Sequence, residues 1–171
     1  MKKINILCGD EVKFNNYLFS HWSIVIESID FLQDYGYKIE FFKYESEKIF
    51  DCDFLFLDST RFPQIKKKVN SYIDIEFLKE ISSKNKNIIW FDMRDSAGTT
   101  QFEVLPYVKK YVKRQLYKDW NFYKKQLYGG RYYTDFYNKH FGIKDEEEYH
   151  YELLDDKYQK KIILGWNLGV F

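Results

Sequence analysis

Short apolar runs that alternate with stretches of helical periodicity place the strongest constraint on the fold of this chain. Three nearly continuous apolar runs, Ile4 to Cys8, Phe54 to Leu57 and Ile88 to Phe91, are each followed directly by Gly or Asp. Such runs are typical of strands that are buried on both faces of a parallel sheet. With helices between them, they predict right-handed βαβ crossovers and a mainly parallel, open sheet.

The intervening stretches supply the helices. Between residues 20 and 35 apolar side chains recur at steps of three and four, Ser20 is placed to cap the start, and Gly36 is placed to end the helix. A second amphipathic helix is expected over residues 73–81, and Tyr37 to Phe42 has the composition of a strand. The chain is therefore expected to fold as a single Rossmann-like domain over residues 1–171, a three-layer α/β sandwich. Six side chains are expected to fill the sheet between the helices: Ile6, Leu7, Phe56, Leu57, Ile89 and Trp90.

Composition excludes several classes of protein. Aromatic residues make up 21% of the chain, which excludes disorder over the whole length. A net charge of +1 means that any affinity for a polyanion must come from a local patch. Cys8 and Cys52 are expected to be reduced and buried, and no apolar stretch approaches the roughly 20 residues of a membrane span. A cytoplasmic location follows as a prediction.

The second half of the chain contains a basic, aromatic segment and an acidic one. Residues 105–141 contain only two acidic residues, Asp119 and Asp135. The same segment contains nine Lys or Arg, at positions 109, 110, 113, 114, 118, 124, 125, 131 and 139. The acidic segment, residues 145–156, either pairs with these cations or forms an exposed loop, and the pattern leaves both open. Residues 110–113 fit a helix by periodicity, or a short edge strand before a helix from about Lys118.

Candidate ligand-binding residues lie in the loops after the strands, because ligands collect beyond the carboxyl ends of parallel strands. The loop of residues 92–100 is the most informative, with two carboxylates, an Arg, three hydroxyls and a Gly. These groups can bind sugar hydroxyls, hold an anion or position a general base. The alternative, which residue types alone favour, is that Asp95 caps a turn that contains Ser96 and Gly98.

A second candidate is the sequence Gly129-Gly130-Arg131. Paired glycines allow close approach of the backbone, so that Arg131 can fork onto a phosphate or carboxylate. Equally, a glycine can end a helix while Arg131 pairs with Asp135 one turn on. The three histidines have no metal-ligand spacing, and the GxSxG, GxGxxG and GxxxxGK[ST] motifs are missing, so neither a metal nor a cofactor is predicted.

Several motifs in order resemble a group of bacterial glycosyltransferase-like proteins from surface polysaccharide clusters. They span roughly residues 88–169: Ile88 to Asp92 with Asp95-Ser96, Phe102 to Val108, Tyr111 to Asp119, Tyr128 to Arg131, and Trp166 to Gly169. Those proteins look like GT-B enzymes, in which an N-terminal Rossmann-like domain receives the acceptor and a C-terminal one binds the nucleotide-sugar donor. The resemblance implies that this chain is the acceptor-side half, and it favours a strand at residues 110–113.

The resemblance also implies an activity and partners. Hexosyl transfer from a nucleotide sugar is expected only when the chain is joined to a donor-binding domain, and the apolar ending, residues 162–171, is expected to lead into that domain. The expected acceptor is a saccharide or a lipid-linked saccharide, with peripheral contact at the inner face of the membrane. Asp95 or Asp10 is the expected base for an inverting transfer. Acceptor or anion contacts are expected from Asn16, Arg94, Ser96, Thr99, Lys113 and Arg131.

The alternative function is a stand-alone domain that binds a polyanion, either nucleic acid or a lipid-linked phosphate, through the basic aromatic segment. An exposed helix whose Tyr face packs on the sheet explains the same pattern and is favoured, so no nucleic-acid partner is expected. Salt dependence separates the two functions, because phosphate-driven binding weakens steeply with salt.

Overall fold

The computed structural model describes residues 1–8, 17–61, 74–146 and 149–166. Within these residues, six strands form one sheet in the order β2-β1-β3-β4-β5-β6, and every neighbouring pair is parallel. The predicted parallel, Rossmann-like α/β fold is therefore confirmed. The strands are β1 (Lys2–Leu7), β2 (Tyr37–Phe42), β3 (Phe54–Asp58), β4 (Ile88–Asp92), β5 (Lys110–Lys113) and β6 (Ile162–Leu164).

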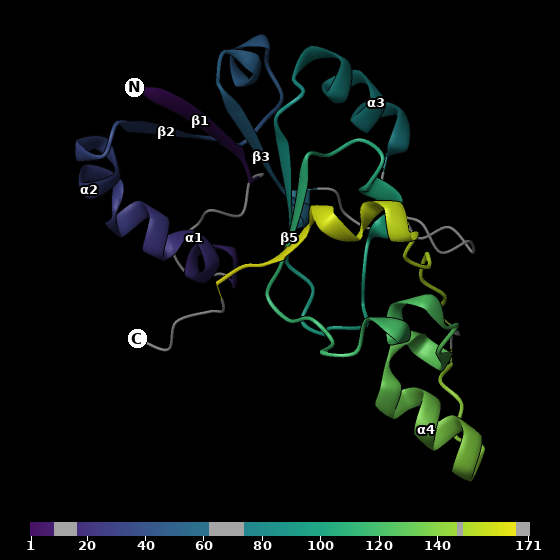
Figure 1. The fold of residues 1–171 in the computed structure, drawn as a ribbon. Coiled ribbons are helices and arrows are strands. Elements are labelled where there is room, and N and C mark those ends of the chain that lie inside the picture. The colour runs from purple at the N-terminus through teal and green to yellow at the C-terminus, as the bar shows by residue number, and fades with distance from the viewer. Residues whose placement is uncertain (9–16, 62–73, 147–148, 167–171) are drawn as a thin grey trace.

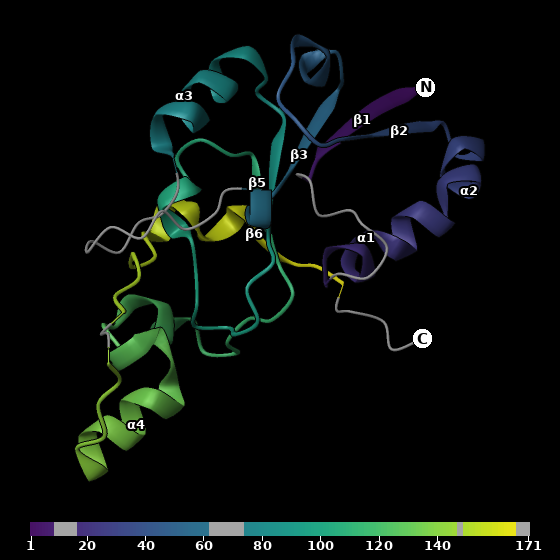
Figure 2. The same ribbon diagram turned by 180° about the vertical axis from the view of Figure 1, so that it is seen from behind.

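Helices lie on both faces of the sheet (Figures 1 and 2). Helices α1 (Tyr17–Glu27) and α2 (Ile29–Asp34) lie on one side, and α3 (Ile75–Lys84) lies on the other. Helix α4 (Tyr132–Phe141) belongs to neither layer. It projects beyond the carboxyl ends of the strands, at the bottom of Figure 1.

Strand order and crossover handedness explain why the two faces are covered unequally. Only the β1 to β2 connection, which contains α1 and α2, moves toward the β2 edge of the sheet, whereas the later connections all move toward β6. Right-handed crossovers in opposite directions lie on opposite faces. The later connections therefore share the α3 face, where Leu57, Leu78, Trp90, Val104 and Tyr111 form the larger core cluster.

On the α1 face a smaller cluster forms around Ile6, Trp22 and Phe91. Next to it, an apolar groove of about 490 Å³ crosses the sheet and is lined by side chains of all six strands, Phe56 and Ile89 among them. We call it the apolar groove.

Four of the six predicted core side chains are buried: Ile6, Leu7, Leu57 and Trp90. The expectation was wrong for Phe56 and Ile89, which are only partly buried because they face the apolar groove.

The first predicted helix forms as two helices. The chain turns at Ser28, between α1 and α2, and Ser20 lies within α1 and does not cap its start. The end was placed correctly, since Gly36 takes the left-handed conformation with φ of 84°. The second predicted helix corresponds to α3, which Asp74 caps by accepting a hydrogen bond from the Phe77 amide at 3.0 Å.

Residues 110–113 form strand β5, so the strand alternative is the right one. The edge position was wrong, because β5 lies between β4 and β6. The helix expected from about Lys118 is absent there; a 3₁₀ turn forms at Trp120–Lys124, and α4 begins only at Tyr132. A period of two explains the strand, since Tyr111 and Lys113 lie on one face of the sheet and Val112 lies on the other.

The remaining structural expectations have simple outcomes. Both cysteines are free thiols, with Cys8 buried and Cys52 partly exposed. Among the described residues, one ion pair joins the acidic and basic segments, between Lys124 and Asp156. Among the described residues no helix has the length and apolar character that crossing a bilayer requires.

Candidate functional site

The candidate site lies where β4 and β5 end. The two strands pair with Trp90 opposite Tyr111 and Asp92 opposite Lys113. Because side chains alternate along a strand, all four point to the α3 face. Two charged groups therefore meet at the carboxyl edge of an apolar layer.

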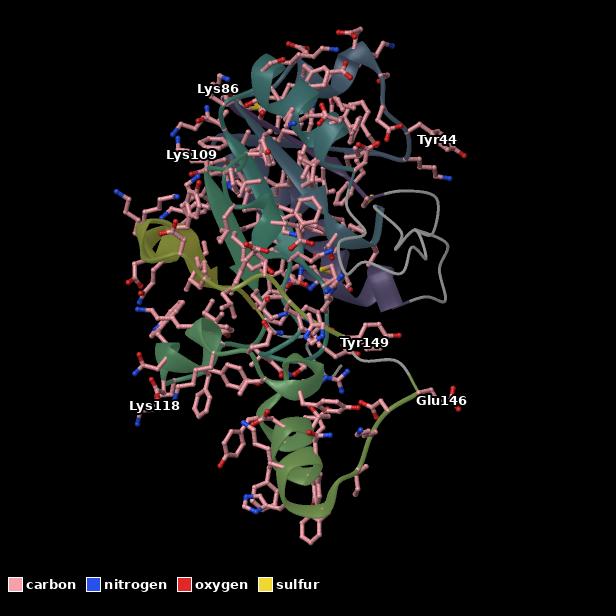
Figure 3. All side chains as sticks on the ribbon, turned by 90° about the vertical axis from the view of Figure 1, so that its right-hand side faces the viewer. Tyr44, Lys86, Lys109, Lys118, Glu146 and Tyr149 are labelled. Atoms are coloured by element: carbon pink, nitrogen blue, oxygen red, sulfur yellow. The ribbon has the colours of Figure 1, made fainter. Side chains whose placement is uncertain are left out.

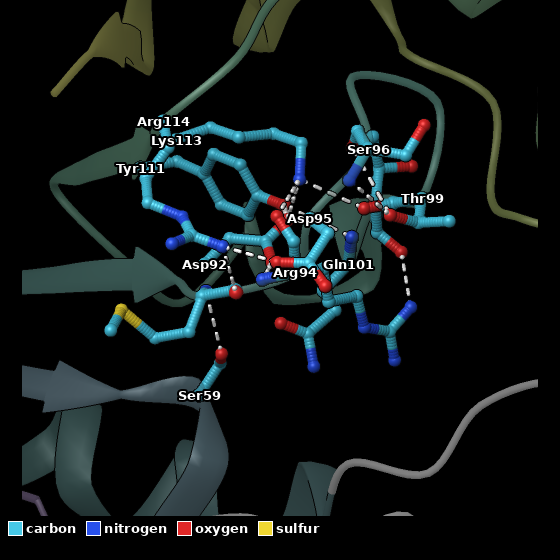
Figure 4. A network of polar contacts seen from close by, with 12 residues as sticks. Ser59, Asp92, Arg94, Asp95, Ser96, Thr99, Gln101, Tyr111, Lys113 and Arg114 are labelled. Carbon is cyan, nitrogen blue, oxygen red and sulfur yellow. Dashed lines mark hydrogen bonds and ion pairs between the residues drawn. The ribbon is translucent and has the colours of Figure 1, made fainter. Parts of the chain in front are cut away.

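Asp92, Tyr111 and Lys113 form a buried network (Figure 4). The Lys113 ammonium donates to Asp92 Oδ2 at 2.9 Å, and both side chains are fully excluded from solvent. The Tyr111 hydroxyl donates to the same carboxylate oxygen and accepts from the backbone N–H of Gln101 at 3.0 Å. A buried ion pair of this kind is tolerated only when its remaining hydrogen-bonding groups are also satisfied.

The buried network holds the loop of residues 93–101, which we call the β4 loop. Lys113 Nζ also donates to the carbonyls of Thr99, at 2.9 Å, and Arg94, at 3.4 Å. Asp92 Oδ1 accepts from the Arg94 amide at 2.9 Å. All three ammonium donors of Lys113 are thus used inside the protein. Its role is to fix the backbone of the loop, and no donor remains for a ligand.

Burial sets the protonation of the network. It raises the pKa of Tyr111 well above its usual value, and the neighbouring Asp92 carboxylate adds to the effect, so the phenol remains a neutral donor. Burial lowers the pKa of Lys113, while attraction to Asp92 opposes that change.

Arg114, the residue after β5, links the loop to the other side of the sheet. Its Nη2 donates to the Met93 carbonyl at 3.0 Å and to Asp95 Oδ1 at 2.6 Å. The Arg114 side chain is 5% exposed, whereas that of Asp95 is 76% exposed. The ion pair therefore holds the Asp95 carboxylate at the surface, on the rim of an adjoining cavity.

The cavity has a volume of about 660 Å³, within the usual range for small-molecule sites. Its walls come from three segments: the β4 loop, the chain around Arg131, and residues 149–151 of the β5 to β6 connection. The β4 loop contributes Arg94, Asp95, Ser96 and Thr99, and the other segments add Arg131, Tyr133, Tyr149, His150 and Tyr151, with Gln115 beside them.

The β4 loop is both a turn and a wall of the cavity. Thr99 Oγ1 donates to the Ser96 carbonyl at 3.0 Å, and Ser96 Oγ accepts from the Gly98 amide at 3.3 Å. These are ordinary turn contacts, as residue types alone suggested. However, Asp95 pairs with Arg114, and the carboxylate that accepts from the loop backbone is Asp92.

At Arg131 the two preceding glycines have left-handed backbone conformations, and anion binding by this arginine stays a prediction. Gly129 and Gly130 have φ of 61° and 69°, and the Arg131 Nη1 donates to the Tyr133 hydroxyl at 2.5 Å. The alternative pair with Asp135 is not formed, because that carboxylate accepts from the Tyr128 amide and from Lys139. Arg131 is therefore directed to the cavity side of α4.

Five residues singled out from the sequence meet at one cavity: Arg94, Asp95, Ser96, Thr99 and Arg131. Lys113 lies instead in the buried network. Asp10 and Asn16 fall outside the described residues.

Sequence reasoning placed Asp92 in the candidate loop but missed its ion pair with Lys113, and it missed Tyr111 of the network and the tyrosines and His150 of the cavity wall. The network could have been found from the alternation of Trp90 and Asp92 against Tyr111 and Lys113, once the strand register was known.

Comparison with protein-family models, with curated proteins and with solved structures finds no match to this chain. Its chemistry must therefore be argued from the site. In the described part of the chain, no three His, Cys, Asp or Glu side chains group as a metal site would require.

Proposed function

We propose that this chain is the acceptor-binding domain of a bacterial surface-polysaccharide glycosyltransferase, and that the cavity receives the saccharide. The observation that carries the proposal is the cavity at the carboxyl ends of β4 and β5, lined by hydroxyl, amide and guanidinium groups. This edge is where parallel α/β sheets bind ligands. The motifs that resemble such transferases contribute Asp95, Ser96, Gln115 and Arg131 to its wall.

The lining suits a sugar in two ways. Ser96, Thr99 and Gln115 offer short polar groups that can pair with hydroxyls. Tyr133 and Tyr151 each offer an apolar ring face together with a hydroxyl, which matches the mixed surface of a pyranose. Such a lining is more polar than that of a typical hydrophobic ligand pocket.

Asp95 is the candidate base in this proposal. Its carboxylate lies on the cavity rim and is held there by Arg114 at 2.6 Å. A rim carboxylate is placed to accept the proton of an acceptor hydroxyl during an inverting transfer. The nucleotide sugar is assigned to a separate donor-binding domain, and the peripheral membrane contact stays a prediction.

Polyanion binding by residues 105–141 receives less support. Lys113 and Arg114 are buried, Lys139 pairs with Asp135, and Lys124 pairs with Asp156. Lys109 lies at the opposite end of the sheet from the cavity wall at Tyr149 (Figure 3). The cations of this segment therefore do not form one continuous surface.

The test is a titration of the ¹⁵N-labelled chain with neutral hexoses and disaccharides, followed by NMR. Shift changes should be confined to the cavity wall, at Ser96, Thr99 and Tyr133. Changes confined to the apolar groove, or no changes with any sugar, would contradict the proposal.

Catalysis is tested in a polypeptide that joins this chain to a donor-binding domain. There, Asp95→Asn should lower turnover by about 100-fold or more, as expected for loss of a general base. Asp156→Asn is the matched control, because it also removes a surface carboxylate from an ion pair, with Lys124, away from the cavity. Equal turnover of the two variants would remove the base assignment.

A further inference from the structure

Two arginines from different parts of the chain enter the cavity because two loops touch through their glycines. A Cβ atom on Gly98 would lie 2.0 Å from the Gly130 carbonyl oxygen, and one on Gly130 would lie 3.0 Å from the Gly98 carbonyl oxygen and 2.0 Å from the Tyr151 ring. One residue beyond Gly130 is Arg131, and Arg94 lies in the same loop as Gly98. The glycine contact thus brings both guanidinium groups to one cavity.

Each guanidinium is held in place by neutral groups. Arg94 Nη1 donates to the Thr100 carbonyl at 3.0 Å, and its guanidinium lies 5.7 Å from the centre of the Tyr151 ring. Arg131 donates to the Tyr133 hydroxyl and lies 5.6 Å from the centre of that ring. A guanidinium has five N–H donors, so both side chains are oriented while most of their donor capacity remains.

The positive charges of Arg94 and Arg131 are not neutralised by nearby carboxylates of the described residues. Among the described residues, no carboxylate lies within ion-pair distance of Arg94 or Arg131, and the buried Nε of Arg131 has no hydrogen-bond partner there. Asp95, whose carboxylate is the only one that the described residues contribute to the cavity wall, pairs with Arg114. Asp145 attracts Arg131 from farther away and is not part of the wall. Counted over the described residues, the cavity wall therefore carries a net positive charge.

We propose that the ligand of this cavity is a phosphorylated saccharide whose phosphate lies between Arg94 and Arg131. This inference rests on the proposed function and specifies its substrate class. A phosphate ester presents several acceptor oxygens and up to two negative charges, so it can engage two guanidinium forks together, whereas a carboxylate has only two oxygens. The sugar then lies against the hydroxyl and tyrosine wall.

The experiment is calorimetric titration of the 171-residue chain at low ionic strength with matched pairs of a hexose and its 1-phosphate. The phosphate should bind at least about 10-fold more tightly than the parent sugar, since hydrogen bonds to charged groups are the stronger ones. Arg94→Gln and Arg131→Gln should each weaken hexose 1-phosphate binding by about 10- to 100-fold, a larger loss than either causes for the parent hexose.

Lys109→Gln is the matched control. It also removes one cation, but Lys109 contacts Asn87 at the amino-terminal edge of the sheet, far from the cavity. Far-ultraviolet circular dichroism and thermal unfolding of each variant keep a folding defect separate from a binding defect. An equal loss of affinity in Lys109→Gln would overturn the proposal, because the effect would then be one of overall charge.

Further probes separate this inference from the proposed function. If hexose and hexose 1-phosphate bind equally, the phosphate subsite is refuted and the saccharide function stands. If inorganic phosphate binds as tightly as hexose 1-phosphate, the subsite stands and the saccharide function is refuted. Glucuronate that binds as tightly as hexose 1-phosphate would overturn the choice of phosphate over carboxylate. Absence of any binding refutes both.

The source of the phosphate is decided by a second ligand pair, a hexose 1-phosphate and the same hexose linked through phosphate to a decyl chain. Tighter binding of the decyl diester would support a lipid-linked acceptor. Tighter binding of the monoester would support a free sugar phosphate. Either result, with sensitivity to Arg131→Gln, supports the subsite.

Discussion

Two polar regions, the buried network and the cavity, lie side by side at the end of β4 and β5. They differ in solvent exposure and in how their charges are paired. In the buried network, Asp92 and Lys113 are fully excluded from solvent and satisfy each other. In the cavity, Arg94 and Arg131 face open space and contact only neutral groups among the described residues. The difference teaches that charges at this edge can have separate tasks: the buried pair of Asp92 and Lys113 fixes the β4 loop, and we propose that Arg94 and Arg131 bind a ligand.

The strongest test of this division is Lys113→Met. It leaves the Asp92 carboxylate buried without its cation, which should lower the free energy of unfolding by about 3–5 kcal/mol. Urea unfolding measures the change. Lys109→Met, at an exposed lysine of the same segment, should stay within about 0.5 kcal/mol of the wild type. Similar small effects of both substitutions would show that the network does not hold the fold.

A second test acts on the contact between the two loops. Gly98→Ala places a methyl group 2.0 Å from the Gly130 carbonyl, and a backbone atom cannot move aside cheaply. The expected loss is about 3 kcal/mol, at the upper end for overpacking. Gly142→Ala is the control, because its methyl group would meet nothing within 4 Å and the cost is limited to the left-handed backbone, about 1 kcal/mol. A well-tolerated Gly98→Ala would mean that the loops can separate, and the two arginines with them.

The third test concerns His21, a buried polar side chain that, unlike the network residues, has no hydrogen-bond partner among the described residues. His21 is 2% exposed, stacks on Trp166 at 4.9 Å, and neither ring nitrogen has a hydrogen-bond partner among the described residues. Burial, assisted by the nearby positive charge of Arg114, lowers its pKa to about 4. The unfolded chain therefore binds a proton that the folded chain does not, between about pH 6.5 and pH 4.

The contribution of His21 to the free energy of unfolding should consequently be fully present above pH 6.5. It should fall as the pH is lowered, by about 2 kcal/mol between pH 7 and pH 5. Asp58, whose pKa is raised by burial, acts in the opposite direction at lower pH, so the comparison must be made against His21→Phe. Urea unfolding of both proteins at pH 7 and pH 5 gives the difference. A wild type and variant that lose the same stability would show that His21 is not the titrating group.

The fold could be predicted because its central strands have sequences that are continuous apolar runs ending in Asp, as at Phe54 to Asp58 and Ile88 to Asp92. Strand β6 was missed because Ile162–Leu164 has only three residues, too few for a period to show. The break at Ser28 was missed because the helical periodicity continues through it.

The candidate site was predictable only in part, for a physical reason. The β4 loop follows its strand directly, so fold class alone places Arg94 and Asp95 at the ligand edge. The role of Lys113 depends on the register between β4 and β5, which no local pattern specifies. The tyrosines at residues 149 and 151 reach the cavity through a long connection whose path is set by tertiary contacts.

The apolar groove on the α1 face has a consequence for the heat capacity of the protein. The parts of Phe56 and Ile89 that no described residue covers meet water before and after unfolding, so they add nothing to the heat-capacity increment that unfolding produces. The increment per residue should therefore fall below the usual value of about 12–15 cal/mol/K, and the stability curve should be flatter than for a sheet covered on both faces. Any molecule that settles in the groove of the folded chain alone would raise the melting temperature through binding linkage, without a new contact at the cavity.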